Sequence, residues 1–225
     1  MMKFLFCYLL TTMVLYAAPL TVQIEALPTQ PVKNEPPKPV VFMIDDFEDG
    51  EFKKFREWWA FGKVLFESSS IQSKKSFLGK VSMKVNGASN NWYAGGFGTY
   101  VGADVQPFSK LKVVLYSPKV NSGSLRVELY DDDNNNAVVD IDDSTGMPSK
   151  DDIFIYDINL VWEGWKVVTI ELSDFVDYNP EVGDNIWNPN QVYGSIGLIQ
   201  MQVIVLSSKH KTENISFEVD TIKFN

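Results

Sequence analysis

Short runs of β-forming residues, separated by turn-forming residues, are the feature that most constrains how this chain folds. The runs are rich in Val, Ile, Phe, Tyr and Trp and are bounded by Gly, Pro, Asn, Asp or Ser, which is typical of strands joined by turns. Ten runs are predicted as strands: 40–44, 63–67, 81–85, 91–100, 110–117, 124–131, 153–156, 165–172, 196–206 and 215–224. Ten strands in a domain of this size predict an all-β fold, a two-sheet β-sandwich of the jelly-roll type.

Two segments are exceptions to this strand pattern. Residues 51–59 and 173–178 can each hold a helical turn, and the rest of the chain has almost no helical periodicity. No sequence repeat with a fixed period is present.

The first 18 residues are predicted to be a secretory signal peptide. A positively charged start is followed by an apolar stretch over residues 4–16, and Ala17 and Ala18 supply small residues for cleavage. An uncleaved N-terminal anchor is the alternative, although the apolar stretch is short for a bilayer. Cys7 is the only cysteine, so a cleaved chain has none for a disulfide or a nucleophile. We expect a secreted, periplasmic or cell-surface protein without a transmembrane segment in the mature chain.

A proline-rich segment over residues 19–39 is predicted as an extended or disordered linker. Residues 40–225 are then long enough for one β-sandwich domain with one core. The whole chain has a formal charge of −9, and loss of the signal peptide would make it one unit more negative. An acidic chain without a basic stripe argues against nucleic acid and anionic lipid as partners.

Alternation of side chains gives two of the predicted strands, 124–131 and 196–206, a core face and a mixed polar face. The polar positions are Arg126, Glu128, Tyr130, Gln200 and Gln202. Guanidinium, carboxylate and amide groups can bind sugar hydroxyls, while an aromatic ring can stack on a sugar ring. This pattern predicts a polysaccharide site, in which Tyr130→Ala weakens binding and leaves the fold intact. An ordinary solvated sheet face is the alternative.

The aromatic and glycine-rich run over 90–100 adds two further candidates, Trp92 and Tyr93. Glycine inside a strand often marks the close approach of a ligand or another backbone. Neighbouring side chains on a strand point in opposite directions, so only one of these two rings is expected to face the core. The other ring is a candidate platform for sugar.

Carboxylates at both ends of the domain suggest a metal site. Asp45, Asp46 and Glu48 follow the first predicted strand, and Asp220 lies on the last one. The first and last strands of a sandwich can meet at one edge, where these oxygens would suit a hard cation such as Ca²⁺.

Several motifs together resemble the galactose-binding-like jelly rolls, and most of all the carbohydrate-binding modules of family 11. The motifs are Ile44-Asp45-Asp46-Phe47-Glu48-Asp49-Gly50, the strand over 79–85, the aromatic and glycine-rich run, the run over 165–175 and Val219-Asp220-Thr221-Ile222. The resemblance covers residues 41 to 225. It implies binding of a β-glucan chain on a concave sheet face by Arg126, Tyr130 and Gln202 with Trp92 or Tyr93. It also implies a structural Ca²⁺ held by Asp46, Glu48 and Asp220.

A second acidic segment, 131–142, approximates the spacing of a calcium-binding loop. Counted from Asp131, Asp133, Asn135 and Asp142 fall at positions 3, 5 and 12, while Asn136 replaces the usual glycine. A polar connection between strands is the alternative, because Asp and Asn favour turns.

Catalytic signatures are weak, so we predict that the protein is not an enzyme. The only histidine, His210, lies in a polar stretch, and no phosphate-binding loop or histidine-based zinc motif is present. Paired carboxylates for glycoside hydrolysis cannot be selected among 29 acidic residues. The leading hypothesis is a secreted carbohydrate-binding module. The alternative is a structural protein of an envelope or a filament, similar to a flagellar sheath protein, which binds protein partners through the same sandwich.

Overall fold

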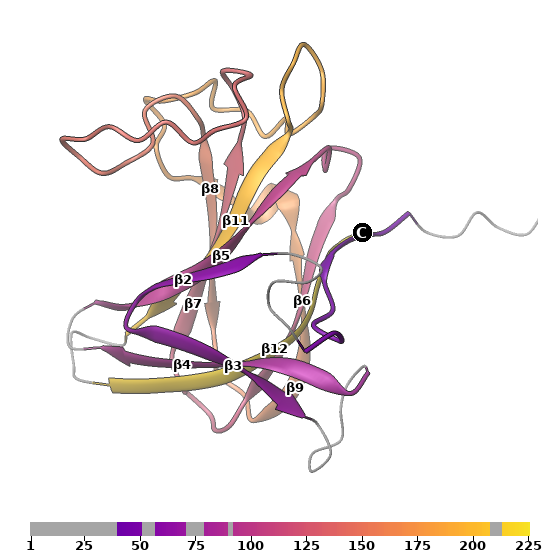
Figure 1. Cartoon of the computed structure of the whole chain (residues 1–225), viewed down its shortest axis with the longest axis vertical. Helices are drawn as coiled ribbons and strands as arrows, with labels where there is room; N and C mark the ends of the chain where they lie inside the picture. The colour runs from indigo at the N-terminus through magenta and orange to yellow at the C-terminus, as the bar shows by residue number, and fades with distance from the viewer. Residues whose placement is uncertain (1–39, 51–56, 71–78, 90–91, 208–212) are drawn as a thin grey trace, which may run out of the picture. The chain divides into compact units, whose positions relative to one another are not determined.

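Two antiparallel sheets of six strands each form the part of the chain that the structure describes (Figure 1). The computed structural model describes residues 40–50, 57–70, 79–89, 92–207 and 213–225. The predicted signal peptide, the predicted linker and His210 lie outside the described residues. The described residues contain no helix with the length and apolarity needed to cross a bilayer.

The first sheet has the strand order β3-β4-β12-β6-β9, and β1 also pairs with β12. Its strands are β1 (Phe42–Asp45), β3 (Val64–Ser70), β4 (Val81–Ser89), β6 (Lys110–Ser117), β9 (Gly164–Glu171) and β12 (Glu213–Phe224). The first and last strands of the domain therefore lie side by side, as the sequence predicts.

The second sheet has the order β10-β8-β7-β11-β5-β2. Its strands are β2 (Trp58–Gly62), β5 (Tyr93–Ala103), β7 (Ser124–Asp131), β8 (Ile153–Asn159), β10 (Val176–Asp177) and β11 (Leu198–Leu206). Residues 132–152, here the β7–β8 loop, and residues 178–197, here the β10–β11 loop, lie together at one end of this sheet (Figure 1).

The core lies between the two sheets, because each strand turns its apolar residues inward. On β7 and β11 the alternate residues Leu125, Val127, Leu129, Met201, Val203 and Val205 are buried. Phe97 of β5 and Phe217 of β12 meet across the sandwich with ring centroids 6.3 Å apart. Burial of this apolar surface is the main force that holds the two sheets together.

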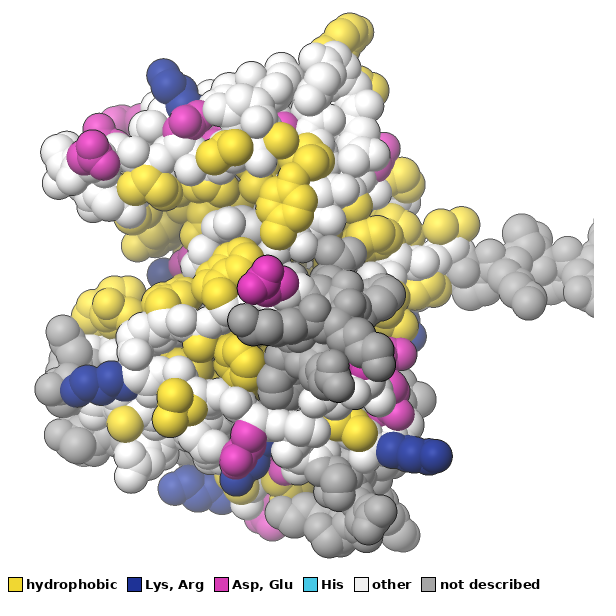
Figure 2. Space-filling view, viewed as in Figure 1, with side chains coloured by type: hydrophobic (Ala, Val, Ile, Leu, Met, Phe, Trp, Pro, Cys, Tyr) yellow, Lys and Arg dark blue, Asp and Glu magenta, His cyan; other side chains and the backbone are white. Residues whose placement is uncertain are grey.

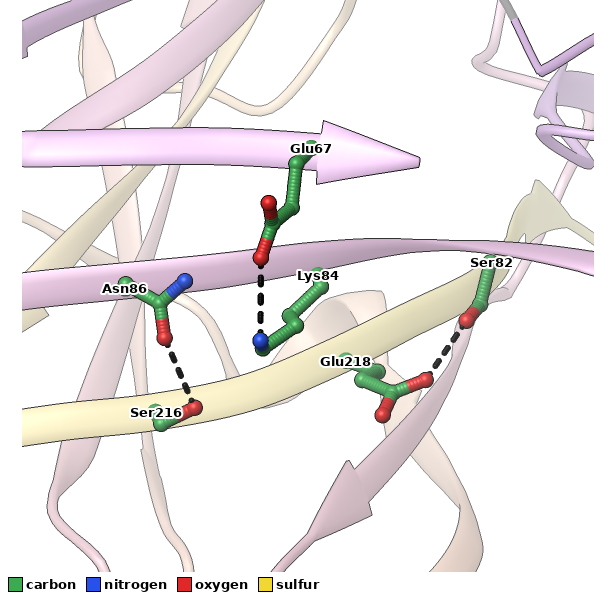
Figure 3. A network of polar contacts seen from close by, with 6 residues as sticks. All are labelled: Glu67, Ser82, Lys84, Asn86, Ser216 and Glu218. Carbon is green, nitrogen blue, oxygen red and sulfur yellow. Dashed lines mark hydrogen bonds and ion pairs between the residues drawn. The ribbon is translucent and has the colours of Figure 1, made fainter. Parts of the chain in front are cut away.

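Polar side chains of β3, β4 and β12 contact one another across the strands of the first sheet (Figure 3). Lys84 on β4 forms an ion pair of 2.9 Å with Glu67 on β3. The hydroxyl of Ser82 donates a 2.7 Å hydrogen bond to Glu218 on β12, and the hydroxyl of Ser216 donates one of 3.0 Å to Asn86. These contacts pair polar groups of neighbouring strands and help to hold the strands in register.

The predicted all-β sandwich is confirmed, with two local differences. A helical turn was expected over 51–59; residues 51–56 lie outside the described residues, and Trp58–Gly62 forms a strand, β2, because its backbone pairs with β5. The expected turn over 173–178 is a short 3₁₀ helix at Leu172–Asp174 followed by β10.

Candidate functional site

A groove with a volume of about 580 Å³ lies on the outer face of the second sheet. Its floor is made by side chains of β2, β7, β8 and β11, and the β7–β8 loop forms a wall. The lining residues are Trp59, Trp92, Arg126, Glu128, Tyr130, Val139, Ile141, Gly146, Met147, Pro148, Ile153, Tyr178, Gln200 and Gln202. Figure 2 shows a hollow below the upper loops, with hydrophobic side chains along both of its sides.

Strand register brings the floor residues of the groove into one row. Gln202 on β11 lies opposite Gly98 on β5 and opposite Glu128 on β7, and Trp59 on β2 lies opposite Gly98 from the other side. A Cβ atom on Gly98 would stand 2.8 Å from the Trp59 ring and 2.9 Å from Cγ of Gln202. Glycine is therefore needed at this position, because the ring and the glutamine side chain both lie over its backbone.

Arg126 is held in place at one side of the groove. Its Nε and one terminal nitrogen donate hydrogen bonds of 2.8 and 3.1 Å to the two oxygens of Asp157, which lies opposite it on β8. The guanidinium carbon also lies 5.3 Å from the centre of the Tyr178 ring. The hydrogen bond that Arg126 donates to Asp157 raises the pKa of Arg126, so the group stays charged and its remaining N–H donors are available to a ligand.

Glu128 and Tyr130 form a second fixed pair in the groove. The Tyr130 hydroxyl donates a 2.8 Å hydrogen bond to Glu128. Burial raises the pKa of the Glu128 carboxyl, while the bond from Tyr130 and the charge of Arg126 act in the opposite direction. Burial is also the main cause of the raised pKa of Tyr130.

Tyr130 is more buried than the sequence predicts. Only 6% of it is exposed, and it packs with Ile153 and Ile199 beneath the β7–β8 loop. Tyr130→Ala is therefore expected to destabilise the fold as well, because truncation would leave a cavity in this apolar cluster.

Trp92 and Tyr93 depart from the expected alternation. β5 begins at Tyr93, so Trp92 precedes the strand, and neither ring enters the core: 48% of Trp92 and 37% of Tyr93 are exposed. Their ring centroids are 4.3 Å apart. Trp92 lines the groove, whereas Tyr93 is not a lining residue and contacts the Trp92 ring.

The structure thus gathers six of the seven predicted sugar-binding residues in one groove, and places Tyr93 beside it. Their binding of sugar stays a prediction. Trp59, Tyr178, Asp157 and the apolar side chains of the β7–β8 loop were not predicted. Trp59 and Trp58 are neighbours on a strand, so one of them had to point outward, but a strand was not expected there. Asp157 and Tyr178 become neighbours of Arg126 only through strand pairing.

The comparisons with known proteins concern the three-dimensional structure. No protein-family model matches the sequence, and no curated protein matches it either. The fold resembles that of family 11 carbohydrate-binding modules. The family 11 module from Clostridium thermocellum, solved with a β-1,3-1,4-mixed-linked tetrasaccharide, is 17% identical with a TM-score of 0.49, over 82% of this chain and 94% of that chain.

Two further solved structures are similar. The module TmCBM61, in complex with β-1,4-galactotriose, is 15% identical with a TM-score of 0.42, over 80% of this chain and 93% of that chain. The CBM22-1 and GH10 modules of xylanase 10B from Clostridium thermocellum, in complex with xylohexaose, are 14% identical with a TM-score of 0.40, over 83% of this chain and 28% of that chain. At these values the likeness is one of fold, so the groove's own residues have to indicate what it binds.

The predicted calcium ligands Asp46, Glu48 and Asp220 have other contacts. β1 ends at Asp45, so Asp46 and Glu48 follow the strand and do not share a strand face as expected. The Glu48 carboxylate accepts hydrogen bonds from the backbone N–H groups of Lys80 and Val81, at 2.7 to 3.1 Å. One Asp220 oxygen accepts a 2.7 Å hydrogen bond from the Thr221 hydroxyl. Calcium binding at this set stays a prediction.

The calcium-type spacing over 131–142 does not gather its residues around one point. Asp142 is exposed, and one of its oxygens accepts hydrogen bonds from the backbone N–H groups of Ser144 and Thr145. These bonds, with that of the Ser144 hydroxyl first, lower the pKa of Asp142. Asp133 instead lies with Asp152 and Asp184, the one group of three metal-ligating side chains found within the described ranges.

Proposed function

We propose that this protein binds a polysaccharide chain in the groove on the outer face of the second sheet. The observation that carries the proposal is the combination, in one concave site, of two indole rings with fixed polar groups. Trp59 and Trp92 offer ring faces, while Arg126, Gln200 and Gln202 offer hydrogen-bonding groups. Sugar rings present an apolar face and a rim of hydroxyls, so they require both kinds of contact at once.

The size and rigidity of the groove support this proposal. Its volume falls within the range of roughly 300–1,000 Å³ that is usual for ligand pockets. The Arg126–Asp157 and Glu128–Tyr130 hydrogen bonds hold these side chains in one geometry, which reduces the side-chain entropy lost on binding. A concave site of this kind also favours a sugar over the protein partner of the alternative hypothesis, which would fit a flatter apolar patch.

We also propose that the groove binds without catalysing a reaction. Glu128, the one carboxylate among the described lining residues, accepts a hydrogen bond from the Tyr130 hydroxyl, and the neighbouring Asp157 is bonded at both oxygens by Arg126. A hydrolytic pair needs one free acid and one free nucleophile or base across the bond to be cleaved. Secretion, predicted from residues 1–18, belongs to the same proposal, because extracellular polysaccharides are then within reach.

Affinity electrophoresis of the purified chain tests this function. Mixed-linkage β-glucan, xylan and β-1,4-galactan are suitable gel polysaccharides. We expect one of them to retard the parent protein, and Trp59→Ala or Trp92→Ala to weaken its affinity at least about tenfold. Tyr193→Ala is the matched control, because this ring is 97% exposed and lies outside the groove lining. Migration unaffected by any polysaccharide, from a protein with a normal melt, would contradict the proposal.

A further inference from the structure

Three separate segments bring carboxylates together at the end of the second sheet. Asp133 follows β7, Asp152 precedes β8, and Asp184 lies in the β10–β11 loop. Each offers an oxygen atom, and these three oxygens all lie within 4.8 Å of one another. Like charges at this separation repel one another, and the fold keeps them together although the segments are 19 or more residues apart in sequence.

The Asp152 carboxylate is the informative member of this group. Asp152 is fully buried, with an exposed fraction of 0%, and neither of its oxygens has a hydrogen-bond partner of normal geometry. The backbone N–H groups of Asn185 and Ile186 are close enough to lower its pKa, but they do not complete a bond to it. A buried carboxylate without a partner is strongly unfavourable, so its oxygens require a ligand that the protein itself does not provide.

The other two carboxylates are oriented toward the same point. One oxygen of Asp133 accepts a 2.8 Å hydrogen bond from the Asp152 backbone N–H, and its other oxygen is buried without a partner. Asp184 accepts hydrogen bonds of 2.8 Å from the Ile186 N–H and 2.9 Å from the Asn188 side chain. Among the described residues, the ion pairs use other carboxylates, so no lysine or arginine neutralises this group.

The backbone closes over the group at Gly183. This residue has a φ of +71°, and a Cβ atom on it would stand 2.1 Å from an Asp152 oxygen and 2.5 Å from an Asp133 oxygen. A side chain is therefore excluded, and the close backbone covers the Asp152 carboxylate. Burial first, and the neighbouring carboxylates next, raise the pKa of Asp133 to about 7 and that of Asp152 to about 6. A bound cation would remove this repulsion.

We propose that Asp133, Asp152 and Asp184 bind a calcium ion that fastens the β7–β8 loop to the β10–β11 loop. Carboxylate oxygens are the preferred ligands of hard divalent cations. Oxygens around Ca²⁺, at about 2.3–2.6 Å from the ion, can stand up to about 5 Å apart, so one calcium shell can hold three oxygens that all lie within 4.8 Å of one another. Mg²⁺ gives up its water ligands reluctantly, so a site made of several protein oxygens favours Ca²⁺. The spacing over 131–142 indicated an acidic site here, but only Asp133 of that set takes part.

The position of the group gives the ion a structural role. The two loops are already joined by the Asp132 carboxylate, which accepts a 2.7 Å hydrogen bond from the Ile196 N–H. Asp131, the last residue of β7, also accepts one of 2.8 Å from the Asn188 N–H. The β7–β8 loop also supplies Ile141 and Met147 to the groove wall. An ion at its base would order this wall, although its binding is measurable without any sugar.

Calorimetric titration of the chelator-treated full chain with CaCl₂, and separately with MgCl₂, tests the proposal. Both titrations are done in the absence of polysaccharide, so the outcome is independent of the proposed sugar binding. We expect saturable binding of Ca²⁺ and weaker binding of Mg²⁺. Asp152→Asn and Asp184→Asn should each weaken this Ca²⁺ binding at least about tenfold, because each removes a ligand charge. Asp143→Asn is the matched control: it makes the same chemical change at an exposed position of the same loop.

Several results would overturn the proposal. They are the absence of saturable Ca²⁺ binding by the parent, tighter binding of Mg²⁺ than of Ca²⁺, and variants that bind Ca²⁺ as well as the Asp143→Asn control does. Asp184 is exposed, so Asp184→Asn should fold even if the buried change at Asp152 does not. We also expect Ca²⁺ to raise the melting temperature of the parent but not that of Asp152→Asn. Without metal, Asp152→Asn should melt at the same temperature as the parent or above it.

Discussion

Arg126 and Asp157 face each other on neighbouring strands and are joined by two parallel hydrogen bonds of 2.8 and 3.1 Å. The pair is partly exposed, with 19% of the arginine side chain and 46% of the aspartate side chain accessible. An exposed ion pair contributes at most about 1 kcal/mol to folding. Its more important effect is to fix the guanidinium at the side of the groove.

Asp157→Asn tests whether this fixed geometry matters for binding. We expect polysaccharide affinity to fall roughly tenfold, because the released Arg126 has to be ordered again when the ligand binds, and the unfolding free energy to fall by less than about 1 kcal/mol. Isothermal titration calorimetry and urea denaturation measure the two effects. Lys84→Ala, which removes an ion pair on the first sheet, is the control for general loss of surface charge pairing. Equal sugar affinity of Asp157→Asn and the parent would show that the pair does not serve the ligand.

Gly98 is predicted to be intolerant of any side chain. Gly98→Ala places a Cβ atom against the Trp59 ring, the Gln202 side chain and the Met201 carbonyl, so we expect a loss of about 1–3 kcal/mol in stability and weaker sugar binding. Chemical denaturation of Gly98→Ala, Trp59→Ala and the double variant forms a thermodynamic cycle. The double variant should be more stable than the sum of the single effects predicts. Additive effects would mean that the ring does not lie over Gly98 in solution.

Tyr130 allows packing and hydrogen bonding to be separated. Tyr130→Ala should destabilise the protein by about 3 kcal/mol or more, because the ring packs with Ile153 and Ile199. Tyr130→Phe keeps the packing and loses only the 2.8 Å bond to Glu128, so its cost should stay near 1–2 kcal/mol. Thermal denaturation of the two variants gives the comparison. If Tyr130→Ala has the same melting temperature as the parent, the ring does not pack in this cluster.

Glu128 gives a pH dependence whose sign is fixed by its raised pKa. The folded protein binds a proton at Glu128 more tightly than the unfolded chain does, because the pKa of this carboxyl is raised above its ordinary value of 4.5. Its contribution to stability is therefore complete below about pH 4.5 and is lost as the pH rises through the folded-state pKa. Relative to Glu128→Gln, which does not titrate, the parent should lose stability over this interval. Urea denaturation of both proteins at several pH values measures the difference, and parallel curves would contradict the raised pKa.

The variant Asp46→Asn distinguishes between the two proposed calcium sites. A site made by Asp46, Glu48 and Asp220 predicts that Asp46→Asn reduces the effect of EDTA on the melting temperature. If the only ion is the one proposed between the two loops, Asp46→Asn should respond to EDTA as the parent does, and Asp152→Asn should not respond. Differential scanning calorimetry of the three proteins with and without EDTA decides between these results. If EDTA does not change the melting temperature of the parent, both proposed calcium sites are contradicted.

The sequence by itself determined the all-β class, most strand positions and the outward direction of the polar residues on β7 and β11. These features are local, because side chains on a strand alternate with a period of two wherever the strand pairs. The prediction therefore holds for Arg126, Glu128 and Gln202 without knowledge of their neighbours. It failed at Trp92, which precedes its strand, and at Trp58–Gly62, where pairing with β5 imposes a strand on a segment of ambiguous pattern.

Only the tertiary structure decided which of these residues meet. Strand order and register place Asp157 beside Arg126 and Trp59 over Gly98, and loop packing brings Asp184 to Asp133 and Asp152. These contacts join positions far apart in the sequence, and many registers would satisfy the same alternation. The choice among them depends on how the two apolar faces pack into one core, which is a property of the whole domain rather than of any segment.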